Sequence, residues 1–165
     1  MSKIFSNIIL AISLILVQGL FFNNINFLGN INPFIYLFFI AYFPIKNNRT
    51  FFISCAFVFG IIIDIFSDTH AIHAAATLTV SFIRPSILKL FFGMAYEHQV
   101  VKFNSIELKQ NIFYLSSIIL IHHFILFGLE IFDTSKIIYI LKNTISSGIL
   151  TFLTIYILYE LIIKK

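Results

Sequence analysis

The sequence predicts an all-α integral membrane protein, a compact bundle of about six transmembrane helices with both termini in the cytoplasm. Of its 165 residues, 59% are hydrophobic and only 11% are charged, whereas a soluble domain carries roughly 25% charged residues. The mean hydropathy is +0.99. Apolar runs of membrane-spanning length recur along the chain. Most of the surface is therefore expected to face lipid, and residues 1–165 are expected to form a single transmembrane domain.

The first apolar segment, residues 4–22, contains no charged residue and follows Lys3. It can span a hydrocarbon core of ~30 Å. It is too long for a signal-peptide core and no small-x-small cleavage site follows, so we interpret it as a retained signal anchor. The predicted spans are residues 4–22, 28–45, 51–66, 71–92, 112–129 and 143–163. Five spans is the alternative count, because the second, third and fourth segments are individually marginal.

Prolines and charged residues mark the second to fourth segments. Pro33 suits the first turn of a helix, where its missing N–H costs nothing, and Pro44 closes the same segment. The third segment contains Asp64. The fourth contains Arg84 followed by Pro85, where the helix is expected to bend or to begin a new turn.

The last two segments complete the bundle. The fifth is uncharged but holds His122 and His123, and the sixth has Glu160 near its end. Lipid offers no hydrogen-bond partners, so each span must satisfy its own backbone. Runs such as residues 61–63 do not alternate polar and apolar residues as the strands of a membrane barrel do. Helices are therefore expected throughout.

The distribution of Lys and Arg predicts the orientation. With six spans and a cytoplasmic N-terminus, nine of the eleven basic residues fall on the cytoplasmic side and two outside. This is the bias that the positive-inside rule predicts for short loops. The nine are Lys3, Lys46, Arg49, Arg84, Lys89, Lys102, Lys109, Lys164 and Lys165, and the two are Lys136 and Lys142.

Asp64 is the first candidate for function, because an ionisable residue at membrane depth costs roughly 2.5–3.5 kcal/mol at a helix centre. Gly60, Asp64 and Ser67 share one helix face at spacings of four and three. The glycine would admit a neighbouring helix closely, and the serine could bond across to it. We favour a packing role for Asp64, with a partner or ligand contact and proton chemistry as the alternatives.

A second polar stripe follows on the fourth segment. His73, Thr77, Ser81 and Arg84 recur at spacings of four, four and three, so they are expected to face other helices and not lipid. His73 lies at about the depth of Asp64, which makes an ion pair between the two an expectation. Arg84 is expected to reach the cytoplasmic interface with its long side chain.

No motif indicates catalysis, a metal site or a cofactor. Adjacent histidines such as His122 and His123 point about 100° apart on a helix, whereas chelation needs a spacing of four. The sequence contains no G-x-S-x-G, H-E-x-x-H or glycine-rich phosphate motif. Cys55 is the single cysteine and so has no disulfide partner within the chain. The scattered basic residues form no face suited to nucleic acid.

The segment from Gly60 to Leu90 reads GIIIDIFSDTHAIHAAATLTVSFIRPSILKL. It resembles the family of the rod-shape-determining membrane protein MreD. The family pattern is a glycine, an aspartate four residues on, an aromatic or leucine followed by serine, a short turn and a small-residue helix. Here these are Gly60, Asp64, Phe66-Ser67 and residues 74–76. The family usually has a glycine in the turn, where this chain has His70-Ala71.

The resemblance implies a non-enzymatic subunit of the bacterial cell-elongation machinery, in the cytoplasmic (inner) membrane, that maintains rod shape and lateral peptidoglycan synthesis. The implied partners are an MreC-like bitopic protein, the MreB filament, RodA with its penicillin-binding protein, and membrane lipids. The alternative is a small-molecule-binding subunit of an energy-coupling vitamin transporter, with Asp64, His73 and Arg84 lining a pocket. The shortage of outward loops to close over a ligand favours the first.

Overall fold

The computed structural model describes residues 3–24, 31–45, 48–98 and 101–164, which form helices and no β-strand. Five helices are long and apolar enough to cross a membrane. They are α1 (Lys3–Leu20), α3 (Arg49–Ser67), α4 (Ile72–Phe92), α6 (Leu108–Ile131) and α7 (Ile137–Ile162). The short elements are η1 (Phe22–Asn24), α2 (Leu37–Tyr42), α5 (Met94–Glu97), η2 (Phe103–Ser105) and η3 (Thr134–Lys136). The prediction of an all-α bundle with several membrane-spanning helices is confirmed.

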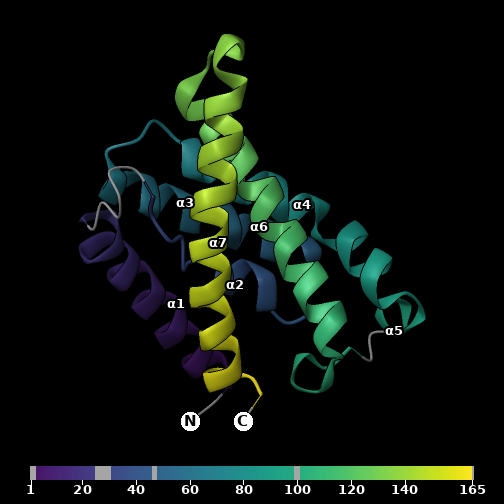
Figure 1. Ribbon diagram of the computed structural model, residues 1–165. Coiled ribbons are helices and arrows are strands. Elements are labelled where there is room, and N and C mark those ends of the chain that lie inside the picture. Colours follow the sequence, from purple (N-terminus) through teal and green to yellow (C-terminus); the bar gives the residue numbers. More distant parts are fainter. Residues whose placement is uncertain (1–2, 25–30, 46–47, 99–100, 165) are drawn as a thin grey trace.

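The long helices run up and down around a shared core (Figure 1). Helix α4 lies near the centre and packs against α3, α6 and α2, while α7 packs on α6 and α1 on α3. Helix α1 begins and α7 ends at the same end of the bundle, and the α6–α7 connection projects at the opposite end (Figure 1). The two ends of the chain therefore lie on the same side of the bundle.

The second predicted span, residues 28–45, is not a membrane-length helix, and this part of the prediction is wrong. Its only helix is the six-residue α2, and residues 28–30 lie outside the described residues. Pro44 ends the helix, because a residue before proline is pushed out of the α region, and Phe43 has φ −56° and ψ 139°. The preceding residues, from Pro33 to Tyr36, are buried but not part of α2.

Irregular backbone at membrane depth is tolerated only where protein surrounds it and supplies hydrogen bonds. The segment from Pro33 to Phe43 meets this condition on both counts, since nearly all of it is buried. At its start, Gln18 of α1 accepts from the Ile35 N–H at 2.8 Å and donates to the Pro33 carbonyl at 3.1 Å. Thr151 of α7 accepts from the Phe34 N–H at 3.0 Å. Polar side chains of the long helices thus hold the interrupted segment in the core.

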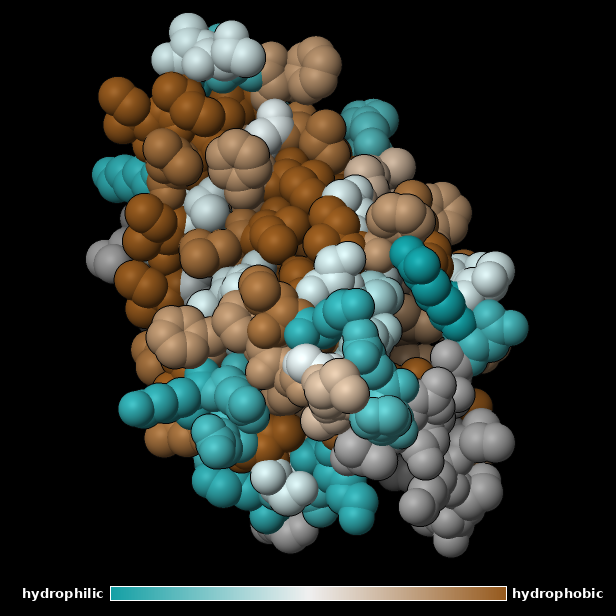
Figure 2. All heavy atoms as spheres, turned by 90° about the vertical axis from the view of Figure 1, so that its right-hand side faces the viewer, coloured by the Kyte–Doolittle hydropathy of each residue, from teal (hydrophilic) through white to brown (hydrophobic). Residues whose placement is uncertain are grey.

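The surface matches a membrane environment. Apolar side chains cover the upper and middle parts of the face shown in Figure 2, and hydrophilic side chains gather toward its lower end. Helix α5 lies at that end (Figure 1). There the ammonium of Lys89, 2.7 Å from Glu97, lowers the pKa of the Glu97 carboxyl. Both side chains are exposed, so the pair contributes little to stability.

Candidate functional site

Asp64 lies at the end of α3 that faces the beginning of α4, and it is 4% exposed. Its Oδ1 accepts from the His73 N–H at 2.9 Å and from the Thr69 hydroxyl at 2.5 Å, and its Oδ2 accepts from the Ala74 N–H at 2.8 Å. The first N–H groups of a helix have no intrahelical acceptor. The carboxylate of one helix therefore caps the next, and it lies where the helix dipole favours a negative charge.

The expected ion pair between the side chains of Asp64 and His73 is absent. The two residues are neighbours, but the contact runs through the backbone N–H of His73. The imidazole points elsewhere, with its Nδ1 2.8 Å from the Tyr36 hydroxyl. The similar depth of the two residues was predicted from helix spacing, but no sequence pattern could show that the aspartate reaches the free N–H groups at the start of α4.

Gly60 brings α3 and α4 into close contact. A methyl group at this position would lie 2.5 Å from the Cα of Ala74 and would overlap the hydroxyl of Thr77. That hydroxyl donates to the carbonyl of His73 at 2.9 Å, within α4. On the same face of α3, Ser67 accepts a hydrogen bond from Asn23 at 2.8 Å. Ser81 is fully buried, and its hydroxyl donates to the Leu78 carbonyl.

We expect Gly60→Ala to lower the free energy of unfolding by about 1–3 kcal/mol, the usual cost of overpacking a tight core. The close neighbour is backbone, which cannot move aside as a side chain can. Gly128→Ala in α6 is the matched control, because a methyl there meets nothing within 4 Å. Unfolding of the purified protein in detergent measures both variants. Equal stability of the two would show that α3 and α4 are not packed so closely.

A chain of aromatic and imidazole groups crosses the core. The hydroxyl of Tyr36, on the interrupted segment, lies 2.8 Å from Nδ1 of His73 and 2.9 Å from Nε2 of His122. Among the described residues, Nδ1 of His122 has no hydrogen-bond partner. A buried N–H without an acceptor is rarer than a bare acceptor. We therefore assign the His122 proton to Nε2, which donates to Tyr36, and Tyr36 then donates to His73.

His123 serves a separate contact with α7. Its Nδ1 lies 2.9 Å from the Ile119 carbonyl, which can only accept, so Nδ1 carries the proton. Its Nε2 then accepts from the hydroxyl of Thr151 at 3.1 Å. The same hydroxyl accepts from the N–H of Phe34. The adjacent histidines thus bond to different parts of the core. Among the described residues, no group of three or more metal-binding side chains occurs.

Arg84 does not reach the interface, contrary to expectation, and it is 3% exposed. One Nη donates to the carbonyls of Ala41 at 3.0 Å and Phe43 at 2.6 Å, at the C-terminal end of α2. Its Nε donates to the hydroxyl of Tyr114 at 3.0 Å. The ring of Phe52 lies 4.9 Å from the guanidinium. The last carbonyls of the short α2 have no intrahelical partner, so they attract the guanidinium inward. Their partial negative charge offsets its positive charge.

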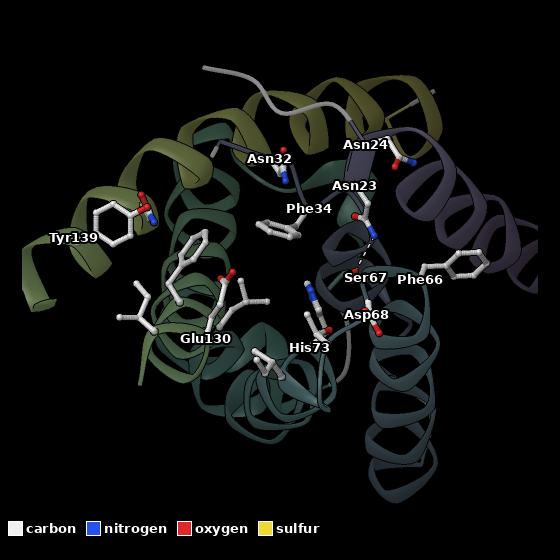
Figure 3. Close-up of a pocket in the computed structure, with 16 residues that line it drawn as sticks. Asn23, Asn24, Asn32, Phe34, Phe66, Ser67, Asp68, His73, Glu130 and Tyr139 are labelled. Carbon is white, nitrogen blue, oxygen red and sulfur yellow. Dashed lines mark hydrogen bonds between the residues drawn. The ribbon is translucent and has the colours of Figure 1, made fainter. Parts of the chain in front are cut away.

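A cavity of about 490 Å³ opens at the end of the bundle opposite the two ends of the chain (Figure 3). Its walls come from the end of α1, the α3–α4 turn and the α6–α7 hairpin, and Phe34 and His73 project into it (Figure 3). The lining residues are Asn23, Asn24, Asn32, Phe34, Phe66, Ser67, Asp68, Thr69, Ile72, His73, Leu126, Phe127, Glu130, Ile131, Tyr139 and Asn143.

Of the residues expected to line a pocket, only His73 borders this cavity. Asp64 and Arg84 do not line it, and their polar groups are held by the backbone of α4 and of the α2 segment. Glu130 and the four asparagines of the cavity were not among the residues predicted from the sequence. The asparagines had one sequence signal, their concentration at segment ends, at positions 23, 24, 32 and 143, whereas Glu130 had none.

Comparisons with known proteins give no further assignment: no family model, no curated protein and no solved structure matches the chain.

Proposed function

We propose that the chain is an MreD-like, non-enzymatic subunit of the bacterial cell-elongation machinery in the inner membrane. The observation that carries the proposal is the Gly60–Leu90 segment, which resembles that family and forms the closely packed α3–α4 hairpin. Within this segment, Asp64 and Thr77 bond to backbone groups of α4, and Arg84 bonds to carbonyls of the α2 segment, as polar residues of a packing scaffold do. The same segment contains the one departure from the family pattern.

That departure is the turn before α4, where the family usually has glycine and this chain has His70-Ala71. Ala71 adopts φ 60° and ψ 22°, a left-handed conformation that glycine takes without steric cost. The backbone of the turn thus has the left-handed conformation that glycine adopts most easily, although the residue here is alanine. This agreement between backbone and family pattern supports the resemblance.

Depletion of the protein is expected to convert rod-shaped cells to round ones, and the solubilised protein is expected to co-purify with an MreC-like bitopic protein. The measurement is cell length and width during depletion, with wild-type complementation as the control. Cells that stay rod-shaped after complete depletion would contradict the proposal. Loss of vitamin uptake in those cells would instead support the transport alternative, for which the cavity is the favouring observation.

The end of the bundle that carries both chain ends is proposed to face the cytoplasm, which follows from the distribution of Lys and Arg. Reporter fusions after Arg49, Lys109 and Lys165 are expected to report the cytoplasm. Fusions after Asn26, Thr69 and Ser135 are expected to report the outside, where the cavity would open. A cytoplasmic signal at Ser135 with an outside C-terminus would overturn this orientation.

A further inference from the structure

The end cavity contains polar groups that no other part of the described chain uses. His73 is 5% exposed, and only its Nδ1 is engaged, by Tyr36. Its Nε2 makes no hydrogen bond to the described residues, and the ring projects into the cavity (Figure 3). A nearly buried imidazole nitrogen without a partner normally has a water molecule or ligand beside it. The nitrogen carries a proton, because Tyr36 donates to the other one.

Glu130 of α6 supplies an acceptor on another wall. Its carboxylate lines the cavity and points toward the space that His73 also faces, beside Phe34 (Figure 3). It makes no hydrogen bond or ion pair with the described residues. Other polar side chains of the cavity wall already have hydrogen-bond partners within the chain. Asn23 bonds to Gln18 and Ser67, and Thr69 bonds to Asp64.

The charges of the lining select the class of ligand. The cavity includes the acids Asp68 and Glu130, and none of its sixteen lining residues is Lys or Arg. A phosphate or carboxylate ligand would find no counter-charge, whereas an ammonium group would. The aromatic faces of Phe34 and Phe127 suit a cation or the C–H face of a sugar ring. The side-chain amide of Asn143, which also lines the cavity, can both donate and accept, which suits hydroxyl groups.

We propose that this cavity binds a small, water-soluble polyhydroxylated amine of about the size of an aminosugar. Its ammonium group donates to the Glu130 carboxylate, and one of its hydroxyl oxygens accepts from Nε2–H of His73. The volume is within the range of known small-molecule sites, ≈ 300–1,000 Å³. The inference is independent of the role in cell shape, because binding is measured on the purified protein.

The test compares glucosamine with glucose, which differ at one carbon by an ammonium in place of a hydroxyl group. Binding to the purified full-length protein in detergent is measured by saturation-transfer NMR and calorimetry at pH 6.5. We expect glucosamine to bind about tenfold more tightly than glucose, the factor that corresponds to 1.4 kcal/mol. Glu130→Gln is expected to remove this preference while leaving the melting temperature close to that of the wild type.

Asp133→Asn is the matched control, since Asp133 follows the end of α6 three residues after Glu130 but does not line the cavity. The hydrogen bonds from Ser135 lower the pKa of its carboxyl, so its charge is present during the measurement. This variant is expected to keep the preference for glucosamine. Equal binding of the two sugars, no saturable binding of glucosamine, or an unchanged preference in Glu130→Gln would overturn the proposal.

Discussion

Arg84→Met is expected to lower the free energy of unfolding by about 3–5 kcal/mol, because hydrogen bonds from a charged donor contribute about 1.5–3 kcal/mol each and a buried carbonyl is left unpaired. The substitution keeps much of the side-chain volume but removes all three donated hydrogen bonds. The Ala41 carbonyl keeps one partner, because the Tyr114 hydroxyl also donates to it at 2.6 Å. The Phe43 carbonyl loses its donor. Unfolding in detergent and the amount of protein in the membrane measure the effect.

Arg49→Met is the matched control for this prediction. Arg49 also donates to a carbonyl, that of Phe82 at 3.2 Å, and its guanidinium also lies 4.9 Å from an aromatic ring. Arg49 is exposed, however, so water replaces what the substitution removes. We expect a small change in stability for this variant. Similar losses for Arg49→Met and Arg84→Met would contradict the view that burial at the end of α2 makes Arg84 important.

Arg84 also shows where sequence reasoning failed. The long apolar segments predicted the five long helices, because a helix that crosses the bilayer needs about twenty apolar residues whatever its tertiary contacts. The segment between Asn32 and Pro44 is apolar enough to be read as a sixth span. Its conformation depends on Gln18, Thr151 and Arg84, which are distant in sequence. No local pattern could show that these polar groups bond its backbone.

For the candidate site, too, the burial of the residues could be predicted from the sequence, but their hydrogen-bond partners could not. The helical spacings placed Gly60 and Asp64 on one face and His73 and Arg84 on another, and all four are buried. Their partners could not be predicted, because four of the contacts to Asp64 and Arg84 use backbone groups of irregular or helix-terminal residues. The cavity depends on three turns that meet at one end of the bundle. Its groups come from opposite ends of the sequence and form no motif.

Asp64→Ala is expected to impair stability and function more than Asp68→Ala or Asp133→Ala, because Asp68 is exposed and Asp133 is only partly buried. Two backbone N–H groups at the start of α4 and one hydroxyl lose their acceptor. Each of the two buried N–H groups left unpaired costs about 1–3 kcal/mol, so we expect a total loss of about 2–6 kcal/mol. The measurements are unfolding in detergent and complementation of cell shape, with the protein level checked by blot. Normal rods at normal abundance from Asp64→Ala would remove this argument.

The Asp64→Asn variant separates capping from charge pairing. Asparagine keeps one acceptor oxygen for Thr69 and His73, but its NH₂ group would face the Ala74 N–H, donor against donor. Its effect is therefore expected to lie between those of the wild type and Asp64→Ala. A double-mutant cycle with His73→Gln gives the decisive comparison. Asp64 is bound by the backbone N–H of His73, which glutamine retains, so the coupling energy is expected to be near zero. A coupling above about 1 kcal/mol would show that the side chains themselves interact, as an ion pair would require.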